Sequence, residues 1–112
     1  MQPILNYING EWCASNAVEF QDVYNPATAE LIGRTPLSPA GEVNAAVQSA
    51  ATALPGWRRI PAQERVQYLF KLKNLLEANL DELSRTITIE CGKTYEESKA
   101  EMRRAIENVE VA

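Results

Sequence analysis

The hydrophobic pattern of this chain changes its period once, near residue 38, and that change limits the folds available to it. Before residue 38, apolar residues occur in short groups separated by turn-forming residues, which is typical of β-hairpins. After it, they recur at intervals of three and four residues, the spacing of an amphipathic helix. The sequence therefore predicts an α+β chain, with a β-hairpin segment over 1–37 and a helical segment over 38–112.

Two turn motifs define the expected strands. Asn9-Gly10 is the strongest two-residue hairpin signal, because a type I′ turn needs a positive φ at both of its central residues. The NPAT segment at 25–28 lies between the apolar pairs 23–24 and 31–32 and is typical of a second turn. We therefore expect two short N-terminal β-hairpins.

The helical segment is predicted to contain three α-helices. The first begins near Ser38, which can act as a cap, and Pro39, which suits the first helical position. It should end at Pro55-Gly56, since both residues interrupt helices. Its apolar residues form one stripe: Val43, Ala46, Val47, Ala50, Ala51 and Leu54.

The second and third helices are expected to meet at Gly92. The second starts at Pro61, and its apolar residues cover more than one narrow stripe, so it should pack on more than one neighbour. Gly92 suits the end of this helix, and Thr94 with Glu97 forms the T-x-x-E capping box of the third. The inner face of the third helix is predicted to contain Tyr95, Ser98, Met102, Ala105, Ile106 and Val109.

Charge and hydropathy exclude several classes of partner. Acidic residues number 15 against 11 basic ones, and Lys and Arg occur singly or in pairs, so no basic patch for nucleic acid or an anionic membrane forms. No apolar run approaches the roughly 20 residues of a membrane span, and no secretory signal follows Met1. We expect a cytoplasmic protein that binds neither nucleic acid nor membranes.

Few residues are available for catalysis. The chain has no histidine, which removes the commonest general base and the commonest metal ligand. Cys13 and Cys91 are far apart and form no C-x-x-C motif, so both are expected to be reduced thiols. No catalytic residue, cofactor-binding residue or metal ligand is predicted in this chain.

Two neighbouring patterns resemble functional motifs but have a simpler interpretation. Cys91 lies at the expected C-terminal end of a helix, where the helix dipole disfavours a thiolate, and no histidine can deprotonate it. Gly92-Lys93-Thr94 lacks the first glycine of a phosphate-binding loop and follows a helix instead of a strand. We interpret this segment as a helix C-cap followed by an N-cap.

The carboxylates of the last helix and the two tryptophans have structural interpretations as well. The glutamates between residues 96 and 110 are expected to be solvated charges, paired at i, i+4 with Lys99 and Arg103. Trp12 and Trp57 are expected to anchor a core or an interface.

Several stretches together resemble the N-terminal part of the aldehyde dehydrogenase superfamily. They are NYINGEW, VYNPATAELIGRTP, the small-residue helix beginning EVNAAVQSAATALPGW, and ELSRTITIECGKTYEESKAEM. The closing RRAIENVEVA most resembles the branch of methylmalonate-semialdehyde dehydrogenases, which are CoA-acylating enzymes. The resemblance covers nearly the whole chain and implies part of the α/β aldehyde dehydrogenase fold, without a complete Rossmann domain.

The resemblance also implies that the chain is the first piece of a longer enzyme. No Gly or Pro occurs between Arg103 and Ala112, so the last helix is expected to continue past the end. The nucleophilic cysteine, the oxyanion-holding asparagine and the nicotinamide site of the family lie in segments that this sequence does not contain. Cys91 matches a variable position of the family. The piece alone is therefore expected to be inactive and to bind no cofactor.

For the intact protein, the resemblance implies NAD-dependent, CoA-acylating oxidation of methylmalonate or malonate semialdehyde. The product would be propionyl-CoA or acetyl-CoA, with loss of carbon dioxide. The implied mechanism is thiolate attack, hydride transfer to the nicotinamide and thiol exchange with CoA, all outside this chain. A homo-oligomer, either a tetramer or a dimer, is implied as well.

Arg104 is the one residue to which the resemblance assigns a role. From spacing alone, it is expected to pair along its helix with Glu101, Glu107 or Asn108. In the semialdehyde branch, the arginine just before IENVE faces the substrate tunnel and holds the substrate carboxylate, and Arg104 falls on that position. A guanidinium suits this role because it binds a carboxylate with two hydrogen bonds and stays charged.

Arg103 and Ala105 flank Arg104 where related sequences tend to have glycines, so helix packing there can differ.

Two other interpretations stay open. A non-acylating enzyme such as succinate-semialdehyde dehydrogenase would share the superfamily stretches. A stand-alone helical interaction module would bind a partner through leftover apolar surface and would fold cooperatively as a monodisperse chain, whereas a fragment would expose that surface and associate.

Overall fold

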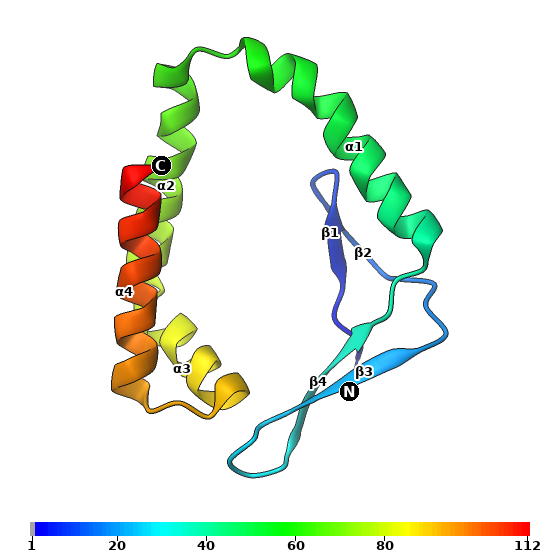
Figure 1. Cartoon of the computed structure of the whole chain (residues 1–112), viewed down its shortest axis with the longest axis vertical. Coiled ribbons are helices and arrows are strands. Elements are labelled where there is room, and N and C mark those ends of the chain that lie inside the picture. The colour runs from blue at the N-terminus through cyan, green and yellow to red at the C-terminus, as the bar shows by residue number, and fades with distance from the viewer. Residues whose placement is uncertain (1) are drawn as a thin grey trace. The chain divides into compact units, whose positions relative to one another are not determined.

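The computed structural model describes residues 2–112, which form two β-hairpins and four α-helices (Figure 1). The predicted α+β class and the two N-terminal hairpins are confirmed, but the predicted number of three helices is wrong. The two hairpins form separate two-stranded antiparallel sheets. The elements in chain order are β1 (Asn6–Ile8), β2 (Glu11–Cys13), β3 (Phe20–Tyr24), β4 (Leu31–Pro36), α1 (Ala40–Arg59), α2 (Ala62–Ala78), α3 (Leu80–Cys91) and α4 (Tyr95–Val111).

The chain divides into two compact units. One contains the residues up to Tyr24 together with Leu31–Arg59. The other contains Asn25–Glu30 and Ile60–Ala112. The turn of the second hairpin therefore belongs with α2, α3 and α4, whereas its strands belong with α1. None of the helices in residues 2–112 has the length and apolar character that crossing a membrane requires.

The turns of both hairpins have the backbone geometry that their residues favour. Asn9 and Gly10 have φ angles of 53° and 80°, as a type I′ turn requires. In the second turn, the Asn25 side-chain oxygen accepts a hydrogen bond from the Ala27 amide at 2.9 Å. The Asn25 amide in turn donates to the Glu30 carbonyl at 2.8 Å, which closes the loop.

The second turn packs on the residue that ends α3. Gly92 has a φ of 72°, in the left-handed region, and caps α3 with its amide donating to the Thr88 carbonyl at 2.9 Å. A Cβ at Gly92 would lie 2.8 Å from Cγ of Pro26. Glycine is therefore required at position 92 for two reasons: its left-handed backbone conformation and the close approach of the NPAT turn.

The first helix begins and ends later than its sequence predicts. The Pro39 carbonyl accepts the first helical bonds, whereas the Ser38 hydroxyl is held by Asn6 at 2.9 Å and by Ser15 at 3.4 Å, so Ser38 does not cap. The helix also continues through Pro55 to Arg59. A proline removes only one backbone hydrogen bond, and Nε of Arg59 donates to the Pro55 carbonyl at 3.0 Å in the last turn.

The predicted second helix is interrupted at Asn79, which gives the fourth helix. The Asn79 backbone has φ −109° and ψ 16°, and its side-chain amide donates to the Leu75 carbonyl at 2.8 Å. This local bond competes with helix continuation, as asparagine side chains commonly do. The Asn79 carbonyl then accepts from the Leu83 amide at 3.0 Å and starts α3.

The buried residues of the helices lie in α3 and α4, and Gly33 and Pro36 of β4 are buried in the other unit. Ser84 of α3 and Ser98 of α4 are fully inaccessible, and Met102 and Ile106 are 8% and 7% exposed. Neither α1 nor α2 has a buried residue. Apolar side chains of α2 remain exposed in the structure: Tyr68, Phe70, Leu72 and Leu75.

Candidate functional site

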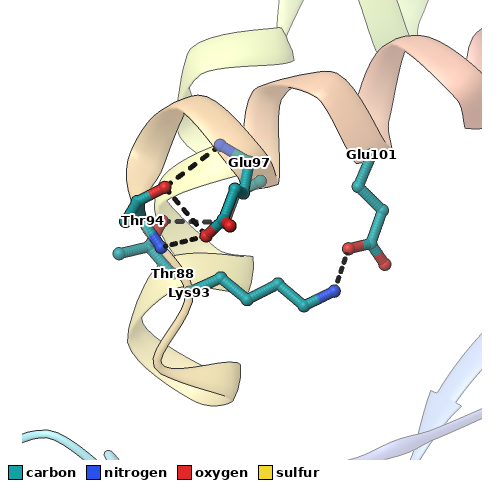
Figure 2. A network of polar contacts seen from close by, with 6 residues as sticks. Thr88, Lys93, Thr94, Glu97 and Glu101 are labelled. Carbon is teal, nitrogen blue, oxygen red and sulfur yellow. Dashed lines mark hydrogen bonds and ion pairs between the residues drawn. The ribbon is translucent and has the colours of Figure 1, made fainter.

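The candidate site is the face of α4 that carries Arg104, and it depends on how the start of this helix is fixed. The Thr94 hydroxyl accepts from the Glu97 amide at 3.3 Å, and the Glu97 carboxylate accepts from the Thr94 amide at 3.1 Å (Figure 2). This capping box, which the sequence predicts, satisfies free amides at the helix start. It also holds the pKa of Glu97 below its ordinary value through hydrogen bonds from Thr94.

The inner face of α4 is held by α3. Ser98 and Ser84 allow close packing because both are small and inaccessible. The Thr88 hydroxyl donates to the Ser98 hydroxyl at 2.9 Å across this contact. The predicted inner residues Ser98, Met102 and Ile106 are buried, whereas the predicted Ala105 is exposed.

Ion pairs and a hydrogen bond fix α4 to its neighbours along its length. Lys73 of α2 contacts Glu110 at 2.9 Å. The Tyr95 hydroxyl donates to Asp81 of α3 at 2.5 Å, and Lys99 lies 3.6 Å from the same carboxylate. The hydrogen bond from Tyr95, followed by the charge of Lys99, holds the pKa of Asp81 below its ordinary value.

Lys93 and Glu101 form an ion pair across the loop between α3 and α4 (Figure 2). The hydrogen bond from Lys93 holds the pKa of Glu101 below its ordinary value, and the same bond raises the pKa of Lys93. The expected i, i+4 pairing of the α4 glutamates with Lys99 and Arg103 is wrong, because Glu101 pairs with Lys93 and Lys99 with Asp81. Spacing rules miss the Lys93–Glu101 pair because it joins a loop residue to the helix that follows.

Arg104 is exposed, and within residues 2–112 its guanidinium makes no hydrogen bond or ion pair. The pairing with Glu101, Glu107 or Asn108 that spacing predicts is therefore absent. Its neighbour Arg103 lines a different feature, an open polar depression of about 480 Å³ beside the break between α2 and α3. The two adjacent arginines thus lie in different surroundings.

The other residues singled out from the sequence do not gather at this site. Cys91 is exposed at the end of α3, and Cys13 is half-buried at the end of β2, and both are free thiols. The interpretation of Gly92-Lys93-Thr94 as a C-cap followed by an N-cap is confirmed. Trp12 is 69% exposed, so it is not a core residue.

The arrangement offers a binding group without a reacting group. Within residues 2–112, no set of three His, Cys, Asp or Glu side chains could hold a metal ion. The glycines are too far apart in sequence to form a G-x-G-x-x-G dinucleotide loop. What the face does present is an unpaired guanidinium on a helix fixed at both ends, which suits the binding of a carboxylate.

The sequence matches a known family over most of its length. The profile described as the aldehyde dehydrogenase family matches residues 12–112. A malonate-semialdehyde dehydrogenase of Bacillus cytotoxicus is 44% identical over 109 residues, which is 97% of this chain and 22% of that enzyme. The chain therefore spans about a fifth of the length of the curated relatives that it matches.

Solved structures show the same similarity. The crystal structure of a methylmalonate-semialdehyde dehydrogenase from Oceanimonas doudoroffii superposes with a TM-score of 0.93 at 37% identity, covering 99% of this chain and 22% of that one. A Sinorhizobium meliloti protein solved in complex with NAD gives a TM-score of 0.92 at 32% identity, covering 99% and 23%. The arrangement of strands and helices described above is thus the arrangement found in these proteins.

Proposed function

The chain belongs to the aldehyde dehydrogenase family, and on that premise we propose that it forms the N-terminal portion of an NAD-dependent, CoA-acylating dehydrogenase of malonate or methylmalonate semialdehyde. The product is acetyl-CoA or propionyl-CoA. The observation that carries the choice of substrate is the unpaired guanidinium of Arg104 on the exposed face of α4. The similarity to a malonate-semialdehyde dehydrogenase supports the same choice.

Arg104 binds the carboxylate of the semialdehyde in this proposal. A charge-assisted, bidentate contact of this kind contributes about 1.5–3 kcal/mol, which corresponds to roughly a ten- to hundredfold preference over an uncharged aldehyde. The helix supplies the rigidity that such a preference needs, since its start is capped and its inner face is packed on α3.

The remaining residues of the chain act as support. The exposed apolar faces of α1 and α2 pack against the rest of the enzyme, and one end of α4 forms a wall of the substrate entrance. NAD would supply the hydride acceptor and CoA the acyl acceptor, and both would contact the part of the enzyme outside this chain, because these residues contain no dinucleotide loop. The proposal extends to a cytoplasmic homo-oligomer, a tetramer or a dimer.

A chimeric enzyme tests the proposal. Residues of this chain would replace the matching 109-residue segment of the Bacillus cytotoxicus enzyme. NADH formation would be followed with malonate semialdehyde and with propanal, which has the same carbon number but no carboxylate, in the presence and absence of CoA. We expect Arg104→Gln to lower kcat/KM for malonate semialdehyde about ten- to hundredfold and to leave propanal within about twofold.

Arg103→Gln is the matched control, because it removes a neighbouring charge whose surroundings are different. Equal losses with both aldehydes in Arg104→Gln would contradict the carboxylate role. Succinate semialdehyde as the preferred substrate, together with activity that needs no CoA, would favour the non-acylating alternative.

A further inference from the structure

A carboxylate that could neutralise Arg104 lies close to it in the same helix. Glu101 precedes Arg104 by three residues, a spacing at which a glutamate and an arginine commonly pair on a helix surface. The pKa of Glu101 is lowered first by the hydrogen bond and the charge of Lys93 and to a smaller extent by the charge of Arg104, so Glu101 and Arg104 are within electrostatic range. Glu101 nevertheless contacts Lys93, and Arg104 is left without an ion pair among residues 2–112.

The position of Lys93 is determined on both sides. Gly92 before it is fixed in the left-handed conformation, and Thr94 after it is fixed by the capping box. Glu97 is the other carboxylate near Lys93, but the capping box holds it at the helix start, where its Oε2 accepts from both the amide and the hydroxyl of Thr94, at 3.1 and 2.9 Å. Lys93 pairs instead with Glu101, and Figure 2 shows the lysine extended along the helix towards it.

We propose that Lys93 is a positioning residue for substrate binding: by holding Glu101, it keeps the Arg104 guanidinium free for the carboxylate of the semialdehyde. This inference rests on the carboxylate-binding role proposed for Arg104. Without Lys93, Glu101 turns to Arg104 and competes with the substrate for the same guanidinium. An exposed pair of this kind changes an equilibrium by about two- to fivefold, which sets the expected size of the effect.

A merely structural role for the pair makes a different prediction. If the Lys93–Glu101 contact only stabilised the loop, removing either partner would have the same effect. In our proposal only Lys93→Gln weakens substrate binding, because it releases a competitor, whereas Glu101→Gln removes that competitor. The double variant Lys93→Gln/Glu101→Gln also lacks the competitor, and it should therefore regain the substrate affinity that Lys93→Gln loses.

Kinetics in the chimeric enzyme give the first test. We expect Lys93→Gln to raise KM for malonate semialdehyde about two- to fivefold with kcat and the propanal kinetics unchanged, and the double variant to return KM to the starting value. Lys73→Gln is the matched control, since it breaks another ion pair between α4 and a neighbouring segment, that with Glu110. An equal rise of KM in Lys93→Gln, Glu101→Gln and the double variant would overturn the proposal.

Titration of the Glu101 carboxyl by NMR in the 112-residue chain gives a second test without any enzyme assay. If Arg104 takes over Glu101 when Lys93 is removed, Arg104→Gln will raise the pKa of Glu101 more in the Lys93→Gln background than in the wild type. An equal rise in both backgrounds would show that Glu101 does not turn to Arg104, and would overturn the inference.

The two proposals fail in different ways. If Arg104→Gln has no selective effect on malonate semialdehyde, the proposed function of Arg104 fails, and the inference about Lys93 fails with it. If Arg104→Gln is selective but Lys93→Gln leaves KM unchanged, only the positioning role of Lys93 is overturned.

Discussion

Helices α1 and α4 have similar lengths, 20 and 17 residues, and both carry an amphipathic pattern, but only α4 buries side chains. Ser98, Met102 and Ile106 of α4 are buried against its neighbours. On α1, Val47 and Leu54 remain 57% and 58% exposed. The comparison shows that periodicity predicts which face of a helix is to be covered, but not whether the covering residues belong to the same stretch of chain.

The two helices also differ in the ion pairs and hydrogen bonds that connect them to neighbouring segments. Side chains of α4 form ion pairs with α2, with α3 and with the loop before the helix. On α1, the hydrogen bonds to a preceding segment lie at its start, where the Glu42 carboxylate accepts from the Ser15 hydroxyl and the Asn16 amide, both at 2.6 Å. Near the end of α1, Nε of Arg59 donates to the Pro55 carbonyl within the last turn of the same helix.

The largest expected effect comes from truncating a buried side chain of α4. Ile106→Ala should lower the free energy of unfolding by about 2–4 kcal/mol, because the residue is 7% exposed and its removal leaves a cavity. Val47→Ala in α1 is the matched change and should cost less than about 0.5 kcal/mol, since its side chain is 57% exposed. Urea unfolding of the chain followed by circular dichroism measures both. Similar losses would show that α1 is packed in solution.

A smaller effect is expected at the glycines. Gly92→Ala should destabilise the chain by about 1–3 kcal/mol, because it forces alanine into a φ of 72° and its Cβ towards Pro26. Gly56→Ala in α1 should stabilise it by about 0.5–1 kcal/mol, since its Cβ would meet nothing within 4 Å. Opposite shifts of the urea midpoint support the account, and shifts of the same sign would contradict it.

The smallest effect concerns acid stability. The pKa of Asp81 is held below its ordinary value of 3.8, first by the Tyr95 hydroxyl and then by Lys99. A carboxyl whose pKa is lower in the folded state contributes stability above its unfolded pKa and loses it as the pH falls through the folded pKa. Between pH 6 and pH 3, the urea midpoint should therefore fall slightly more in the wild type than in Asp81→Asn.

Glu82→Gln is the control for this titration, because its carboxylate makes no hydrogen bond or ion pair within residues 2–112. The urea midpoint of Glu82→Gln should fall as much as that of the wild type. If the urea midpoint of Asp81→Asn also falls as much as that of the wild type, Asp81 does not contribute to acid stability.

The elements with strong local signals are those that the sequence predicts correctly. Asn9-Gly10, the NPAT turn, Gly92 and the Thr94–Glu97 capping box each determine their own geometry from a few residues. The hairpins and the start of α4 are therefore recovered without tertiary information. The expected boundary between residues 37 and 38 stays a prediction.

The predictions from sequence are wrong where competing local hydrogen bonds, or partners outside the same helix, determine the structure. Pro55 does not end α1, because the loss of one hydrogen bond is tolerated, and the Asn79 side chain breaks a helix whose apolar pattern runs on. The partner of Glu101 was missed for a related reason, since Lys93 reaches it across a loop. The position of Arg104 follows from the α4 pattern, but its lack of a partner does not follow from spacing.

The measurement that tests the central claim most directly is the ratio of kcat/KM for malonate semialdehyde to that for propanal, in the chimeric enzyme with and without Arg104→Gln. The account predicts a ratio that falls about ten- to hundredfold on substitution, because only malonate semialdehyde has a carboxylate that Arg104 can bind. An unchanged ratio would contradict it and would show that the exposed face of α4 does not select the substrate.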